Sequence, residues 1–178
     1  MRVVLDINVL LVSLPVGRKY RPIFDALKAG VFKLLITNEI LTEYEEKIAE
    51  KTRPDIAQNV VRLLLNLPNV EKVEVFYHWN LIVNDPDDNK YTDCAIAANA
   101  TYVVSDDADF RILKRIPFPK LALLTSDEFL AVLRRLLTDA LVLTPERLAS
   151  PLRPGFLPSA KFSFMNSLAL MLAPLVVD

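Results

Sequence analysis

Aspartate residues are concentrated in one short stretch of the chain, where their type and spacing could do chemistry. Residues 85–110 read DPDDNKYTDCAIAANATYVVSDDADF and contain seven of the 13 aspartates in the sequence. They form two groups, at 85–93 and 106–109, on either side of an uncharged segment. Because crowded carboxylates repel and raise one another's pKa, a folded chain that gathers them needs a compensating positive charge.

A divalent metal ion is one source of that charge. Sites built only from carboxylate oxygens suit Mg²⁺ or Mn²⁺ rather than zinc or copper. Such an ion keeps the acids ionised, orients a phosphodiester and lowers the pKa of a bound water. The structural alternative is that these aspartates cap helices, and the Asp-Pro-Asp-Asp sequence at 85–88 is also a turn signal. The spacing alone leaves both interpretations open.

The composition excludes several other chemistries. With one cysteine and one histidine in 178 residues, no disulfide can form within the chain, and a Cys/His zinc site or a Ser-His-Asp triad has almost no material. The net charge of −1 provides no general attraction for nucleic acid, so any such role requires a local site. The chain begins with an apolar strand and no basic signal region, so we expect a cytoplasmic protein without a membrane role.

Apolar runs alternate with helix-like segments over residues 1–138, which predicts an α/β domain with a mostly parallel sheet. Proline or a capping residue precedes most of the helices. The expected strands are 1–6, 31–36, 70–76 (an edge strand), 101–105 and 120–125. The expected helices begin at Pro22, at Thr37 or Asn38, at Pro54, at Asp88, at Asp107 and at Ser126.

The acids follow the carboxyl ends of these strands, where ligands bind in open parallel sheets. Asp6 ends the first strand, and we expect no helix to begin directly after it, which weakens a capping role. Asp107 follows the strand at 101–105, and Asp93 lies on the helix that leads into that strand. Three separate segments are therefore expected to bring carboxylates to one edge of the sheet.

The acidic motifs resemble those of PIN-domain nucleases and occur in the same order. The match covers about residues 1–135, and the most similar branch is that of the VapC-like toxins of toxin–antitoxin systems. One small departure is Ser105, where the family more often has threonine. The motifs are VVLDINVLL, ITNEILTEYEE, DPDDNKYTDCAIAANA and YVVSDDADF.

The resemblance implies a three-layer α/β/α sandwich and an endoribonuclease that uses Mg²⁺ or Mn²⁺ to cleave single-stranded or structured RNA. It also implies a cognate antitoxin and a homodimer as partners. Glu43 is selected by the resemblance alone, because neighbouring glutamates on the same helix are equally acidic. The implied catalytic and metal-binding residues are Asp6, Glu43, Asp93 and Asp107, with Asp88 and Asp109 as supporting acids.

Other readings remain open beside this one. A basic loop containing Arg18, Lys19 and Arg21 could contact RNA phosphates near the site, or it could be an ordinary solvated loop. A phosphatase that uses Asp6 as its nucleophile would usually need an acid two residues later, where this chain has Asn8. A PIN-like binding or assembly module with little or no nuclease activity is the main alternative function.

The C-terminal part of the chain differs in character from the rest. Residues 139–178 are interrupted by prolines and end in an apolar segment, 162–177. That segment is shorter than a membrane span and contains Asn166 and Pro174. We expect a nuclease domain over residues 1–138, followed by an extension that packs on its own domain or on a partner subunit.

Overall fold

A computed structural model of the chain describes residues 1–142, with side chains described through residue 139. Its centre is a five-stranded sheet in the order β3-β2-β1-β4-β5, in which every pairing is parallel. The predicted α/β class is therefore confirmed. The strands are β1 (Arg2–Leu5), β2 (Lys33–Ile36), β3 (Val70–Lys72), β4 (Tyr102–Val104) and β5 (Leu123–Leu124).

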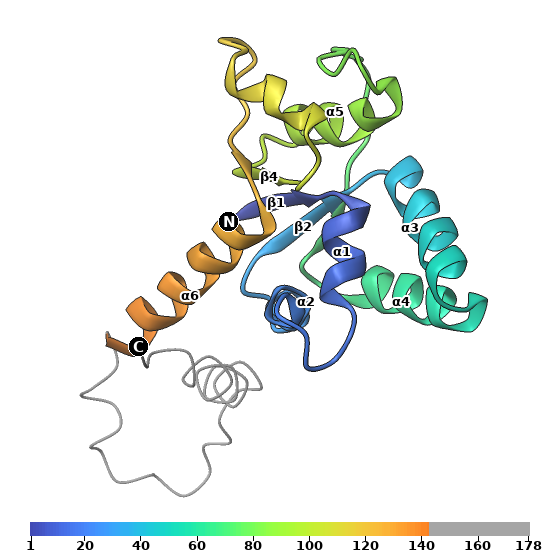
Figure 1. Ribbon diagram of the computed structural model, residues 1–178, viewed down its shortest axis with the longest axis vertical. Helices are drawn as coiled ribbons and strands as arrows, with labels where there is room; N and C mark the ends of the chain where they lie inside the picture. The colour runs from blue at the N-terminus through green and yellow to red at the C-terminus, as the bar shows by residue number, and fades with distance from the viewer. Residues whose placement is uncertain (143–178) are drawn as a thin grey trace, which may run out of the picture.

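Helices cover the sheet on both faces, as Figure 1 shows: α5 lies on one face, and α1 and α2 lie on the other. Helices α3 and α4 pack against each other, and α6 extends away from β5. The helices are α1 (Ile7–Ser13), α2 (Arg21–Lys28), α3 (Asn38–Lys51), α4 (Pro54–Asn66), α5 (Asn89–Ala97) and α6 (Ser126–Val142), with two 3₁₀ helices, η1 (Pro86–Asp88) and η2 (Asp109–Lys114).

The helix beginnings follow from their sequences, with one exception. Thr37 caps α3 by accepting a hydrogen bond from the Ile40 amide at 3.2 Å, and Pro54 occupies the first turn of α4. The expectation that no helix follows Asp6 directly is wrong, because α1 begins at Ile7. Asp6 caps this helix by accepting from the Asn8 amide at 3.2 Å. The short apolar segment at 7–13 is long enough for two turns, which the sequence interpretation overlooked.

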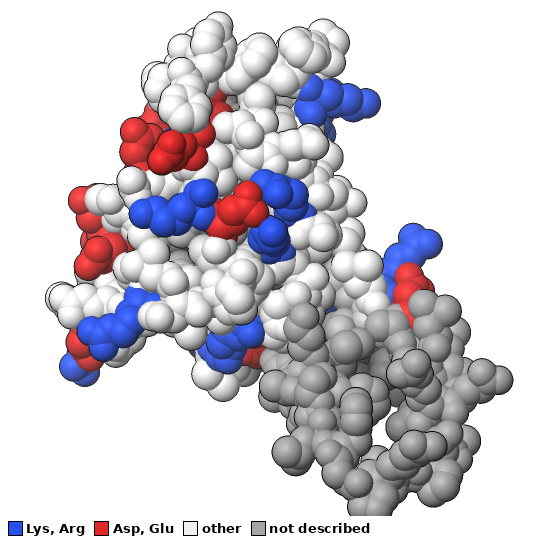
Figure 2. All heavy atoms as spheres, turned by 180° about the vertical axis from the view of Figure 1, so that it is seen from behind, with Lys and Arg blue, Asp and Glu red and all other residues white. Residues whose placement is uncertain are grey.

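Charged residues of both signs are distributed over the surface. Figure 2, which views the molecule from behind relative to Figure 1, shows acidic and basic side chains interspersed on that face with no continuous basic area. This distribution agrees with the net charge of −1. Any contact with a polyanion must therefore be made by a small local group of cations.

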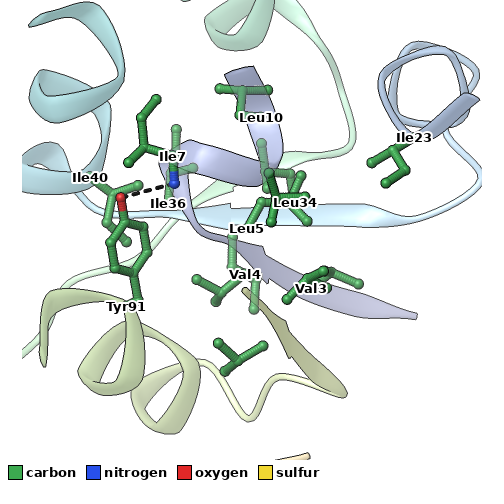
Figure 3. Packing of buried hydrophobic residues seen from close by; sticks show 14 of the residues in the cluster. Val3, Val4, Leu5, Ile7, Leu10, Ile23, Leu34, Ile36, Ile40 and Tyr91 are labelled. Carbon is green, nitrogen blue, oxygen red and sulfur yellow. Dashed lines mark hydrogen bonds between the residues drawn. The ribbon is translucent and has the colours of Figure 1, made fainter. Parts of the chain in front are cut away.

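The core consists of the strand interiors and the helix faces that cover them. Val3, Val4 and Leu34 have no exposed surface, as expected for parallel strands covered on both sides (Figure 3). Tyr91 of α5 reaches across this core, and its hydroxyl accepts a hydrogen bond from the Ile7 amide at 3.2 Å. The contact joins α5 directly to the beginning of α1 and so fixes the position of α5 relative to α1.

Three further expectations concern the sheet edge and the C-terminal part. The predicted edge strand at 70–76 pairs only over Val70–Lys72, where it forms the sheet edge. The predicted boundary at residue 138 falls inside α6, which runs to Val142, and the prolines and apolar segment of the extension lie outside the described residues. Between residues 1 and 142, no helix is both long and apolar enough to cross a membrane.

Candidate active site at the carboxyl ends of β1 and β4

The acidic residues gather where β1 and β4 lie side by side in the middle of the sheet. β1 pairs with β2 on one side and with β4 on the other. The strand order therefore reverses at β1, with β2 and β3 on one side of it and β4 and β5 on the other. This arrangement is the topological switch point at which open α/β sheets leave a crevice for ligands. Asp6 directly follows β1, and Ser105 directly follows β4.

Asp6 is held rigidly in the floor of this crevice. Its side chain is only 2% exposed, and its carboxylate accepts hydrogen bonds from the Asn8 amide at 3.2 Å and the Ser105 hydroxyl at 2.7 Å. Burial raises the pKa of Asp6, the two hydrogen bonds oppose that change, and the nearby charges of Glu43 and Asp107 add to it. A buried carboxylate beside other acids is therefore built into the end of the central strand.

Asp107 is tied to the same point by a turn after β4. Its amide donates to the Ser105 hydroxyl at 3.0 Å, so one serine connects the two acids. The Asp107 carboxylate accepts from the Asp109 amide at 2.9 Å, and the Asp109 carboxylate accepts from the Asn84 side chain at 3.0 Å. Asp107 itself is exposed, so its remaining oxygen is accessible to a ligand.

Asp88 joins this pair from the beginning of α5. Its pKa is raised to about 7, first by burial and then by the negative charges of Asp6, Asp85 and Asp107. Lys90 opposes the change only weakly. Asp88 therefore lies close enough to Asp6 and Asp107 to experience their charge. Three segments that are far apart in the sequence contribute to one electrostatically coupled group.

Glu43 approaches the group from α3 but is held by two other side chains. Its carboxylate accepts a hydrogen bond from the Tyr91 hydroxyl and lies 3.3 Å from the Lys90 ammonium group. Lys90 also pairs with Asp87. Burial, together with the hydrogen bond to Glu43, raises the pKa of Tyr91 far above its ordinary value, so it is a permanent donor. Glu43 is thus positioned beside Asp6 with part of its charge already compensated.

Asp93 is placed differently from the other acids. It is 1% exposed, and its two oxygens accept from His78 Nδ1 and from the Trp79 amide, each at 2.9 Å. It lines one pocket with Glu43 and Lys90, but both of its oxygens are already bonded to the segment at 78–79.

Asp106 has a structural role at the beginning of α6. Its carboxylate accepts from the Ser126 amide at 2.8 Å and from the Ser126 hydroxyl at 2.6 Å. These bonds satisfy the beginning of α6, so the acid at 106 stabilises a helix while its neighbour at 107 faces the crevice.

The acids at the crevice are the type of ligand that a divalent cation prefers, but they are not yet arranged as a coordination shell. In the part of the chain with described side chains, no three His, Cys, Asp or Glu residues already form a group arranged to hold a metal ion. The donors at the crevice are nonetheless all carboxylate oxygens. Burial raises the pKa values of Asp6 and Asp88, and the negative charges of neighbouring acids add to both shifts. A dication would reverse both shifts, because its charge favours the ionised acids.

Comparison with protein families identifies the chain. The family model described as PIN domain matches residues 2–109, a range that contains all of these acids. The chain belongs to the PIN domain family. Members of this family are generally nucleases that use divalent metals, as the resemblance of the acidic motifs implied. No curated protein sequence gives a significant match.

The fold of this PIN domain is similar to that of a solved structure. A crystal structure of VapBC2 from Rickettsia felis, bound to a DNA fragment from their promoter, matches with a TM-score of 0.51 and 20% identity, covering 70% of this chain and 98% of the matched chain. The T. brucei RRP44 PIN domain has a TM-score of 0.45 and 17% identity, covering 79% of this chain and 85% of the other. At this level of identity the VapBC2 match supports the three-layer fold.

The cations of the predicted RNA-binding loop are largely paired within the PIN domain. The Lys19 ammonium group lies 2.6 Å from Asp127 of α6, and Arg21 pairs with Asp25 at 3.0 Å and donates to the Leu14 carbonyl. Arg18 is exposed and forms no ion pair with another described residue.

A different group of cations borders the acids. Arg111 and Lys114 belong to η2, and Arg115 directly follows it. All three line a groove together with Ser105 and Asp107. Sequence reasoning missed them, although their spacing directly after the last acidic motif was a visible signal.

Proposed function

We propose that this PIN domain is a divalent-metal-dependent endoribonuclease whose active site is formed by Asp6, Asp88 and Asp107, with Glu43 beside them. One observation supports this assignment above all others: the Ser105 hydroxyl joins the Asp6 carboxylate at 2.7 Å to the Asp107 amide at 3.0 Å, at the carboxyl ends of β1 and β4. The negative charges of Asp6 and Asp107 add to the burial that raises the pKa of Asp88, and acids with raised pKa values in a crevice of an α/β sheet are typical of functional sites.

Mg²⁺ or Mn²⁺ is the proposed cofactor, because every donor is a carboxylate oxygen. When bound, such an ion supplies an activated water and stabilises the leaving oxygen of a phosphodiester. Ser105 fixes the positions of Asp6 and Asp107 relative to each other. Ser105 donates to Asp6 and accepts from the Asp107 amide, so β1 and β4 present their carboxylates at one point.

We assign to Asp88 the metal-binding role that the sequence pattern gave to Asp93. Asp88 is coupled to Asp6 and Asp107, whereas both oxygens of Asp93 are already bonded to the segment at 78–79. Asp93 then acts as a positioning residue, and Asp109 orients Asp107 through its amide. Glu43 is proposed as the fourth acid, with Lys90 balancing its charge in the metal-free protein.

RNA is the proposed substrate, and a cognate antitoxin is the proposed partner. The VapC-like order of the motifs and the fold shared with VapBC2 support a toxin of a toxin–antitoxin module. A homodimer is part of the same proposal.

The test is cleavage of a single-stranded RNA with Mg²⁺ or Mn²⁺, compared with the same reaction in chelator. We expect Asp6→Asn and Asp88→Asn to lower the rate by at least about 100-fold, since each removes a ligand of an ion worth several kcal/mol in the transition state. Glu45→Gln is the matched control, because Glu45 is exposed on α3 only two residues from Glu43. It should cleave at the wild-type rate.

Two outcomes would contradict this function. If wild type leaves RNA intact with both metals while it still binds RNA or a partner protein, the domain is a PIN-like binding or assembly module. If Asp88→Asn cleaves normally and Asp93→Asn does not, the assignment of the third acid returns to Asp93.

A further inference from the structure

Three aromatic side chains, Tyr77, Trp79 and Phe118, meet edge to face in one exposed cluster, which we call the aromatic stack. The rings of Tyr77 and Trp79 lie 5.2 Å apart at 75°, and those of Trp79 and Phe118 lie 6.0 Å apart at 77°. Tyr77 is 66% exposed and Phe118 is 77% exposed. The stack joins the segment after β3 to the loop before β5, two parts of the chain that are about 40 residues apart.

Burial does not account for this stack, because its outer rings remain largely in water. Large apolar groups that stay exposed together mark binding surfaces more often than single exposed residues do. The backbone of Trp79, the central ring, is also held in place: its amide donates to the buried Asp93 carboxylate at 2.9 Å. The adjacent His78 ring contacts the other oxygen of Asp93. A buried acid is therefore used to hold an exposed aromatic surface in place.

Three exposed cations lie close to Phe118 along the chain. Arg111, Lys114 and Arg115 are exposed, line the groove that contains Asp107, and make no ion pair with any residue whose side chain is described. Phe118 follows Arg115 by three residues, a distance of at most about 11 Å along the chain.

The chain that carries Trp79 also continues to the groove. Asn84, five residues after Trp79, lines the groove and donates to Asp109 at 3.0 Å. Two lining residues of the groove that contains Asp107, Asn84 and Arg115, are therefore close along the chain to Trp79 and Phe118.

We propose that the aromatic stack and the three η2 cations form the binding surface for the single-stranded part of an RNA substrate, which rests on the proposed nuclease function. Unpaired bases stack on Trp79 and Phe118, and the adjoining phosphates contact Arg111, Lys114 and Arg115. Base stacking on exposed aromatic rings combined with a basic groove is the general mode by which proteins bind single strands. A protein partner would account for the apolar rings but not for three cations that line a groove with Asp107 and have no ion-pair partner among the described side chains.

The single tryptophan of the chain offers a direct test, because Trp79 reports on its own environment. The probe is an oligouridylate of about ten nucleotides, within the range that single-strand-binding sites cover. In chelator, which prevents cleavage, we expect the oligonucleotide to quench Trp79 fluorescence to a saturating end point. An RNA duplex of the same length should quench it far less, since its bases are already stacked.

Two classes of variant separate stacking from phosphate contacts. Phe118→Ala should weaken binding about 5- to 100-fold, as loss of one stacked base predicts, and leave the salt dependence unchanged. Arg111→Ala and Arg115→Ala should each reduce the slope of log affinity against log salt by about 0.7. The controls are Phe76→Ala and Lys72→Ala: Phe76 is 88% exposed but outside the stack, and Lys72 is exposed on β3. Both should bind like wild type.

The outcomes distinguish this surface from the function on which it rests. If Phe118→Ala, folded by its melting curve, binds and cleaves RNA like wild type, the stack is not the RNA surface. If it binds RNA normally but loses self-association or antitoxin binding, the stack is a protein interface and the inference is wrong. If RNA binds with the predicted variant effects but is never cleaved with metal, the binding surface stands and the proposed nuclease function fails.

Discussion

The Ser105 hydroxyl donates a 2.7 Å hydrogen bond to Asp6, a residue 99 positions earlier in the chain. The same hydroxyl accepts from the Asp107 amide at 3.0 Å. A side chain that is almost completely buried thus joins the ends of β1 and β4 and sets the distance between two acids. The spacing of these carboxylates depends on this serine as much as on the strands.

Replacing Ser105 tests that dependence. Ser105→Ala leaves one Asp6 oxygen without its partner in a buried place, so we expect a loss of about 1–3 kcal/mol in the free energy of unfolding and slower cleavage. Ser105→Thr keeps the hydroxyl and should restore most of the activity. Denaturant unfolding and RNA cleavage measure the two effects. Equal activity of the alanine and threonine variants would show that the hydroxyl does not position the acids.

Asp88 should make the stability of the metal-free protein depend on pH. Its pKa is about 7 in the fold against 3.8 in the unfolded chain, so the folded state binds the proton more tightly. The stabilisation is fully present below the unfolded value and is lost as the pH rises through about 7.

The measurement is the melting temperature of wild type and Asp88→Asn in chelator from about pH 5 to about pH 8. We expect wild type to lose stability relative to Asp88→Asn as the pH rises across that range. Addition of Mg²⁺ or Mn²⁺ at neutral pH should raise the melting temperature of wild type more than that of the variant. A pH-independent difference between the two proteins would mean that Asp88 is not coupled to its acidic neighbours.

Asp93 is expected to affect the stack more than the cleavage chemistry. Asp93→Ala removes both acceptor oxygens and leaves the Trp79 amide without its partner, so both contacts to the segment at 78–79 are lost, with a loss of about 1–3 kcal/mol in stability. The emission of Trp79 should shift toward that of exposed tryptophan. At saturating RNA the variant should cleave faster than Asp88→Asn. An unchanged emission spectrum would show that Asp93 does not hold this segment.

Tyr91 connects three helices through one hydroxyl group. It accepts from the Ile7 amide at 3.2 Å and donates to Glu43, so α1, α3 and α5 meet at this point. Tyr91→Phe leaves the Ile7 amide unsatisfied in the core, and we expect a loss of about 1–3 kcal/mol in stability. Tyr102→Phe, at a tyrosine for which no hydroxyl hydrogen bond occurs among the described residues, is the control. Equal stability of both variants would contradict this role.

Lys19 should contribute little to RNA binding, although the sequence placed it near the first acid. It pairs with Asp127 at 2.6 Å, and both side chains are largely exposed. We expect Lys19→Ala to change RNA affinity by less than about twofold, in contrast to Arg111→Ala. A salt-dependent loss of affinity in Lys19→Ala would return this loop to the binding surface.

Local sequence features determined most of the secondary structure. Continuous apolar runs such as Val3 to Leu5 could only be stable as covered parallel strands, and Thr37 and Pro54 mark helix beginnings by their own hydrogen-bonding and backbone geometry. The convergence of acids also followed, because parallel strands end at the same side of a sheet. The helix directly after Asp6 escaped prediction because seven residues carry too short a pattern to identify.

Which acids meet was decided only by the tertiary structure. Asp88 and Asp93 lie in one motif, and their spacing along the chain does not say which side of α5 faces the ends of β1 and β4. That choice depends on how α5 packs, and Tyr91 fixes it through Ile7. The same holds for charge: Lys19 pairs with Asp127, more than a hundred residues later, whereas Arg111 and Arg115 line a groove with Asp107 and form no ion pair with any residue up to 139. Side-chain types and periodicity are local properties of a sequence, but the partner of a charge depends on distances that exist only after packing.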